Sequence, residues 1–202
     1  MKKLISSLAG IPFSIIAQQF PEAPMCFYAL KTVLSLFVFQ NGYKTLLAMD
    51  MKTHGCTFQA EKPVTITKVG YRAWTPGITY RISLWQVGQE LALSTCCCSP
   101  KNTEGMEFFS LIKPVQIVPG NIYYITRTYI SGGPNNSSGD CVGWLNNKQG
   151  GNIYPVKQHV ITLTNGFFSD DVNPLQSESM SNISTGTLLP YIDFGYTLRQ
   201  PY

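Results

Sequence analysis

The stretch from Tyr80 to Leu93 constrains the fold more than any other part of the chain. Its first residues alternate between apolar and polar side chains: Tyr80, Arg81, Ile82, Ser83 and Leu84. A period of two is typical of a strand with one buried face. Gly88 then lies in a predicted turn, and Leu91 starts a second apolar run. The sequence therefore predicts a β-hairpin in the middle of the chain, with other strands arranged around it.

Further short strand patterns follow between residues 54 and 198. They are predicted at residues 56–59, 64–73, 96–98, 107–111, 115–117, 122–130, 141–145, 160–163, 167–168 and 191–198. The apolar phase slips near Lys68, where a β-bulge or bend would absorb one extra residue. Residues 122–130 carry large side chains on both faces, so we expect this strand to be central. Short strands separated by turns, without a helical period, predict an all-β fold, an antiparallel β-sandwich of jelly-roll type.

The N-terminal region differs from the rest of the chain. A charged start and a short apolar run predict a signal peptide at residues 1–17, which is too short for a stable membrane span. This predicts a secreted or cell-envelope location, with the cytoplasm as the alternative. The pattern leaves the structure of residues 18–50 open, irregular or helical, and assigns residues 51–202 to one β-sandwich domain.

Composition narrows the classes of partner. The formal net charge of +4 comes from scattered residues and not from a basic cluster, so nucleic-acid binding is not expected. The six cysteines lack the paired spacing of a zinc site. In a strand, Cys96 and Cys98 face one side and Cys97 the other. We interpret the cysteines as small buried or half-buried thiols, with a disulfide between Cys56 and Cys141 as the alternative.

Several turn and core residues follow one another in an order known from a bacterial family. They are Thr57-Phe58, Ile66 to Tyr71, Leu84-Trp85 with Gly88 and Leu91-Ala92, Lys113-Pro114-Val115, Pro119-Gly120 and Tyr123-Tyr124. In this order the chain resembles the bacterial domain of unknown function DUF4082 over about residues 54–130. The resemblance implies a β-sandwich accessory module of secreted or envelope proteins, some of them attached to carbohydrate-active or adhesive chains.

The sequence contains no recognisable catalytic motif. The two histidines, His54 and His159, have no Gly-x-Ser-x-Gly nucleophile motif beside them, and no pair of acids matches a glycosidase pattern. The chain is therefore predicted not to be an enzyme and to need no cofactor. Calcium is a weaker alternative, because acids lie in or beside loops rich in Asn and Gly: Asp140, Asp170, Asp171 and Asp193. Solvated loop acids are the preferred interpretation of these residues.

Loop aromatics suggest a binding surface. A flat ring beside amide groups suits a sugar, and the candidate residues are Trp74, Trp144, Asn146 and Tyr154, although core packing is the preferred interpretation of Trp144. The predicted function is a non-catalytic module that binds a glycan or a surface protein through its loops. The alternative is a structural or adhesive surface subunit that pairs through exposed strand edges.

Overall fold

A computed structural model describes residues 31–32, 44–47, 52–73, 76–131, 141–144, 152–169 and 188–198. At residues 31–32, 44–47, 141–144 and 188 only the backbone is described. The strands are β1 (Lys31–Thr32), β2 (Lys44–Leu47), β3 (Thr53–Ala60), β4 (Val64–Tyr71), β5 (Thr79–Gln86), β6 (Ser94–Cys98), β7 (Glu107–Ile117), β8 (Tyr123–Ser131), β9 (Cys141–Trp144), β10 (Val156–Gln158), β11 (Ile161–Ser169), β12 (Leu188–Pro190) and β13 (Ile192–Leu198).

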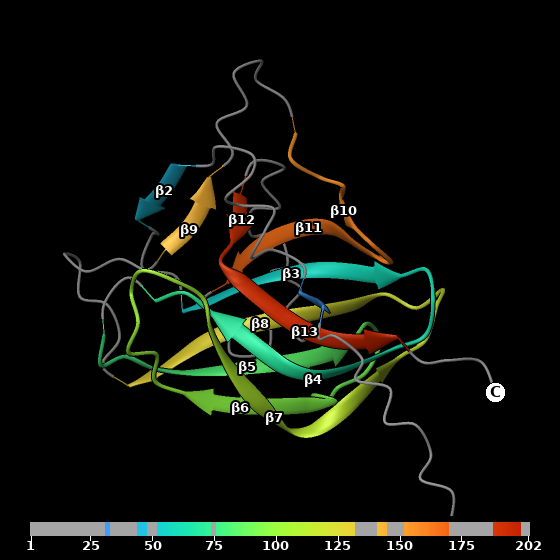
Figure 1. Cartoon of the computed structure of the whole chain (residues 1–202), viewed down its shortest axis with the longest axis horizontal. Coiled ribbons are helices and arrows are strands. Elements are labelled where there is room, and N and C mark those ends of the chain that lie inside the picture. The colour runs from blue at the N-terminus through green and yellow to red at the C-terminus, as the bar shows by residue number, and fades with distance from the viewer. Residues whose placement is uncertain are drawn as a thin grey trace, which may run out of the picture.

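These strands form two large antiparallel sheets that pack against each other (Figure 1). One sheet has the order β1-β13-β4-β7 and the other the order β10-β11-β3-β8-β5-β6, while β12-β9-β2 form a smaller third sheet. The described ranges contain strands and turns but no helix, and thus no helix long and apolar enough to cross a membrane. The predicted all-β sandwich is confirmed, whereas the jelly-roll arrangement stays a prediction.

The central hairpin is confirmed, with one correction to its second strand. β5 pairs antiparallel with β6, from Tyr80 opposite Cys98 to Leu84 opposite Ser94. Gly88 lies in the connecting turn with a φ of +85°. Leu91 was expected to restart the strand, but it lies in the connecting loop with 80% of its surface exposed. The paired strand begins three residues later, at Ser94.

β8 is central, as its two apolar faces predicted. It lies between β3 and β5 in the six-stranded sheet, and its first six residues, 123–128, are buried. Ile122 was expected to belong to this strand, but it precedes β8 and is 44% exposed.

Irregular pairing explains two strands that the pattern divided. β7 is one strand across residues 107–117, where two were expected, because its pairing with β4 jumps from Ser110 to Val115. β11 is also continuous, with a register shift between Leu163 and Asn165. The irregularity predicted near Lys68 is confirmed, since β13 pairs with Ile66 and Lys68 but skips the residue between them.

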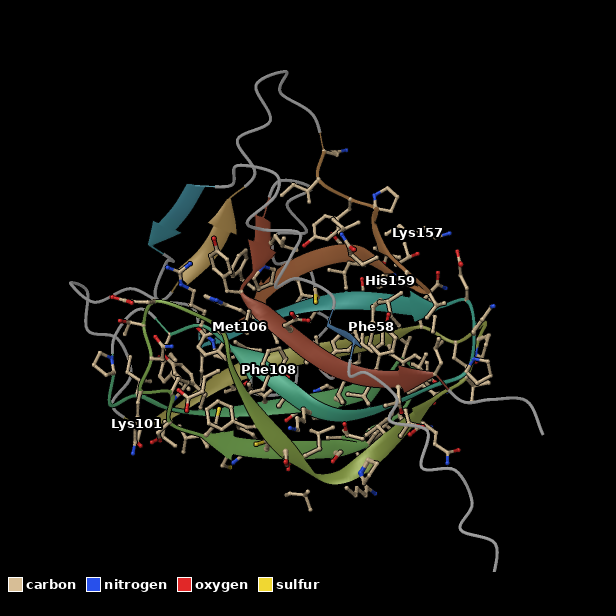
Figure 2. All side chains as sticks on the ribbon, viewed as in Figure 1. Phe58, Lys101, Met106, Phe108, Lys157 and His159 are labelled. Atoms are coloured by element: carbon tan, nitrogen blue, oxygen red, sulfur yellow. The ribbon has the colours of Figure 1, made fainter. Side chains whose placement is uncertain are left out.

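The core lies between the two large sheets and is rich in aromatic rings. Phe58 of β3 packs against Phe194 of β13 with ring centroids 4.8 Å apart, and Figure 2 shows Phe58 between the sheets. Tyr71 of β4 meets Tyr80 of β5 edge-on at 4.7 Å. Burying one large apolar side chain stabilises a fold by about 1.5–3 kcal/mol, so contacts of this kind hold the sheets together.

Two short strands come from residues 18–50. β1 pairs with β13, and β2 pairs with β9. Both partners lie far away in the sequence, so part of this segment adds edge strands to the sheets. The predicted signal peptide at residues 1–17 lies outside the described residues.

Candidate functional site

The structure describes the side chain of only one of the predicted glycan-binding residues, Tyr154. Trp74 and Asn146 lie outside the described residues, and Trp144 is described only as the last backbone position of β9. Tyr154 is half-buried, packs against the main core and precedes a cis bond to Pro155. The sugar platform therefore stays a prediction.

Three of the four weak calcium candidates receive no structural test. Asp140, Asp170 and Asp171 all lie outside the described residues. Asp193 was expected in or beside a loop, which is wrong: it is fully buried in β13, and its Oδ1 accepts a hydrogen bond of 2.7 Å from the Phe194 N–H. Across the described residues, no three His, Cys, Asp or Glu side chains gather as metal ligands would.

The cysteine pattern is confirmed for residues 96–98. Cys96 and Cys98 are buried, and Cys97 between them is exposed. Cys56 is a buried free thiol, so its proposed disulfide with Cys141 is wrong. Burial raises the pKa of Cys56 and of Cys98 to about 12. These two thiols therefore stay protonated near neutral pH and are poor nucleophiles.

A buried charged cluster occupies the inner face of the six-stranded sheet. Arg127 is fully buried, and its Nη2 lies 2.6 Å from Nδ1 of the buried His54. The guanidinium also donates to the Lys52 carbonyl oxygen at 3.4 Å, and its carbon lies 5.4 Å and 5.3 Å from the ring centroids of Tyr71 and Tyr80.

This arrangement determines the role of His54. A guanidinium only donates hydrogen bonds, so Nδ1 must accept and the ring must be neutral, with its proton on Nε2. The His54 ring also meets Phe168 edge-on at 4.7 Å. Closed off from solvent by aromatic rings, Arg127 and His54 act in the packing of the sheets.

The most unusual surface of the described chain is a set of four exposed aliphatic side chains on two neighbouring loops. Of the six large hydrophobic side chains exposed in the described residues, four lie in residues 87–93 and 118–122. They are Val87, Leu91, Val118 and Ile122, with 46%, 80%, 54% and 44% of their surface exposed. We call these four side chains the apolar loop surface.

The strands place both loops at the same end of the sandwich. The last residue of β5, Gln86, pairs with the first residue of β8, Tyr123. One residue further on, the Val87 N–H donates a hydrogen bond of 3.0 Å to the Ile122 carbonyl oxygen. The two loops are therefore joined at the point where each leaves the sheet.

Internal hydrogen bonds hold each loop. In the first, the Gln89 N–H donates to the Gln86 carbonyl oxygen at 3.1 Å. In the second, the Tyr123 hydroxyl accepts from the Val118 N–H at 3.0 Å and from the Asn121 side-chain amide at 3.4 Å. Both loops are thus preformed and present aliphatic groups to solvent.

The apolar loop surface was missed because its residues looked like the ends of strands. Val118 and Ile122 flank the turn Pro119-Gly120, and Leu91 starts an apolar run that predicts a strand. Aliphatic residues inside or directly beside a strong turn signal are the clue that would have found it.

Comparison with known proteins gives no further guide to function. No family model matches the chain, and no curated protein matches it either. The resemblance to DUF4082 stays a prediction.

Proposed function

We propose that the chain is a non-catalytic binding module that holds a protein partner through the apolar loop surface. The observation that carries this proposal is the exposure of Val87, Leu91, Val118 and Ile122 on two hydrogen-bonded loops. Several exposed apolar groups gathered on neighbouring loops are typical of interaction sites.

The chemistry of this surface favours a protein over a glycan. Sugars are held by flat aromatic rings and amide groups, whereas the four side chains here are branched aliphatics. Such side chains gain affinity when an apolar partner surface removes them from water, at about 25 cal/mol for each Å² buried. The preformed loops reduce the entropy lost on binding. Glycan binding through Tyr154 and its predicted neighbours is therefore the second candidate.

The proposed location is the cell envelope or the extracellular space, supported by the signal-like residues 1–17. The cytoplasm remains the alternative, and the four free thiols at residues 56, 96, 97 and 98 are typical of a reducing compartment. Binding through the loops does not depend on which compartment is correct. The non-catalytic role is supported by the burial of His54 against Arg127.

Site-specific photo-crosslinking in the cells that produce the chain tests the proposal. A photoreactive residue at Leu91 should give one discrete adduct with a protein, and the same adduct should form from Ile122. The matched control is Ile112, which is exposed to the same 80% as Leu91 but lies in β7. No adduct should form from this position.

Two outcomes would oppose the proposal. Equal adducts from positions 91 and 112 would show non-specific contact. A glycan array that binds the folded chain and loses that binding on Tyr154→Ala, with no protein adduct from Leu91, would favour the sugar platform.

A further inference from the structure

The outer face of the six-stranded sheet carries a second, smaller apolar cluster. It consists of Trp85 in β5, Tyr124 in β8 and Phe167 in β11, and all three side chains are buried. Their neighbours in sequence, such as Leu84 and Tyr123, belong to the main core. Because successive side chains of a strand point to opposite faces, the three rings lie on the side of the sheet that faces away from the core.

Specific contacts hold the rings of this cluster in place. The Trp85 and Tyr124 rings stack with centroids 5.7 Å apart and planes inclined by 4°, and the Phe167 ring meets Tyr124 edge-on at 6.2 Å. The Trp85 indole N–H donates a hydrogen bond of 3.0 Å to the Thr126 hydroxyl oxygen. A methyl group added at Gly55 would overlap the Phe167 ring, so glycine at this position lets the ring lie over β3. These contacts give the cluster one defined geometry.

The register of β5 and β8 connects this cluster to the apolar loop surface. Trp85 lies opposite Tyr124 in the ladder. The same register places Val87 opposite Ile122, where the Val87 N–H bonds the Ile122 carbonyl oxygen at 3.0 Å. Residues two apart on a strand share a face, so Val87 and Ile122 continue the face on which the stacked rings lie. Two of the four side chains of the apolar loop surface therefore occupy the positions next to the stack.

The loop at residues 87–93 also contacts the cluster near its other end. Ala92 packs against the cluster, while Leu93 packs against the main core. The Leu93 N–H closes the loop with a hydrogen bond of 2.7 Å to the Leu84 carbonyl oxygen. Leu91 directly precedes the residue that rests on the cluster, so a shift of the rings would move its exposed side chain.

We propose that Trp85 and Tyr124 are positioning residues, whose stacked rings hold the two loops in the arrangement that binds the partner. Gly88 and Gly120 give these loops a permissive backbone, so the loops need a common support if their side chains are to act as one surface. The stack supplies it, because one ring comes from the strand before the first loop and the other from the strand after the second. This role in binding rests on the proposed function, whereas the effect of the stack on the loops does not.

Amide hydrogen exchange of the full chain, followed by NMR, tests the effect on the loops. Trp85→Leu removes the stack, so the Val87 amide should exchange about fivefold faster than in the wild type. The control is the Tyr129 amide, which donates to the Lys52 carbonyl oxygen at 3.2 Å at the other end of β8 and should change much less. Tyr124→Phe should exchange like the wild type, because it keeps the ring and removes a buried hydroxyl that has no hydrogen-bond partner in the described chain.

Phe167→Leu is a milder second variant, with circular dichroism to show that each variant is folded. It removes the edge-on contact with Tyr124 but leaves the stack in place. The Val87 amide should therefore exchange about twofold faster, a smaller effect than in Trp85→Leu.

Photo-crosslinking from Leu91 in the producing cells tests the role in binding. The yield of the protein adduct should fall about fivefold in Trp85→Leu and stay at the wild-type level in Tyr124→Phe. An adduct of wild-type yield from Trp85→Leu, despite faster exchange at Val87, would overturn the role of the stack in binding.

The exchange data separate this inference from the proposed function. Equal acceleration at Val87 and Tyr129, or unchanged exchange at Val87 in folded Trp85→Leu and Phe167→Leu, would overturn the inference. If the wild type gives no adduct from Leu91 while the exchange at Val87 changes as expected, the proposed function fails and the positioning of the loops by the stack is supported.

Discussion

Two regions of this molecule reverse the usual distribution of side chains between core and surface. The Arg127–His54 cluster buries a permanent charge, while the apolar loop surface exposes aliphatic groups. The charge has partners within the fold: a ring nitrogen of His54, a backbone carbonyl oxygen and two aromatic faces. In contrast, the aliphatic groups have solvent where a core residue would have neighbours. The buried cluster is thus explained by the stability of the chain itself, whereas the exposed group is explained by the proposed protein partner.

The strongest test of this contrast removes the buried charge. Arg127→Ala leaves His54 without its donor and opens a cavity between Tyr71 and Tyr80. Removing a large buried side chain, together with its hydrogen bond to a buried partner, typically costs about 2–5 kcal/mol. Urea denaturation should show a fall of this size in the free energy of unfolding. A fall below about 1 kcal/mol would mean that the cluster contributes little to packing.

Unfolding at alkaline pH tests the burial of a second group in the core, the thiol of Cys56. Burial, with a smaller contribution from the Asp193 carboxylate, raises the pKa of Cys56 from 9.0 to about 12. Above pH 9 the unfolded thiol loses its proton while the folded thiol keeps it, so this thiol favours unfolding increasingly up to about pH 12. The expected loss is about 1.4 kcal/mol for each pH unit.

Cys56→Ala removes this contribution, so its unfolding free energy should decline less steeply than that of the wild type between pH 9 and pH 11. Denaturant titrations at several pH values make the comparison. Parallel profiles for the two proteins would contradict the burial argument.

Left-handed backbone occurs at a glycine in one loop of the apolar loop surface and at a histidine in the β10–β11 turn. Gly120 has a φ of +87°, and a methyl group added there would meet nothing within 4 Å, whereas His159 holds a φ of +54° with a full side chain. Figure 2 shows His159 at this turn, beside Lys157. Left-handed backbone costs a non-glycine residue about 1–2 kcal/mol.

Gly120→Ala should therefore lower the free energy of unfolding by about 1 kcal/mol, and His159→Gly should raise it by about 0.5 kcal/mol after the entropy cost of glycine. Thermal unfolding of both variants measures the two signs. If both lower the melting temperature, strain at His159 is not the controlling factor.

The smallest expected effect on stability is at the apolar loop surface. Leu91→Ser changes a side chain that is 80% exposed, so the free energy of unfolding should stay within about 0.5 kcal/mol of the wild type. Its melting curve, measured beside that of Arg127→Ala, shows directly whether the two regions differ in role. A loss of more than about 2 kcal/mol would place Leu91 in the folding core, as the apolar pattern first suggested.

Much of the fold is readable from local patterns, and the candidate surface is not. Alternation in β5 and β8 correctly predicted a hairpin and a central strand, because side-chain period and burial are local properties of a strand. It also placed Arg127 on the same face as Tyr123 and Ile125. The burial of that arginine was not predictable, since its partners His54, Tyr71 and Tyr80 come from three other strands.

Irregular strand pairing and exposed loop residues account for the other features that the sequence did not predict. The extra residues in β7 and β11 break the period of two, so one strand looked like two. For Val118 and Ile122, apolar identity predicts burial, and only the paired loops show that the fold directs these side chains to solvent. Trp74 and Asn146 lie outside the described residues, so the loop-aromatic hypothesis stays a prediction.

The most direct test of the central claim is the affinity of the crosslinked partner for matched surface variants. Isothermal titration with the purified partner should show at least about a tenfold weaker affinity for Leu91→Ser/Val118→Ser, with unchanged melting. Ile112→Ser should bind like the wild type. If the double variant also binds with wild-type affinity, the apolar loop surface is not the binding site and the account of its exposure is wrong.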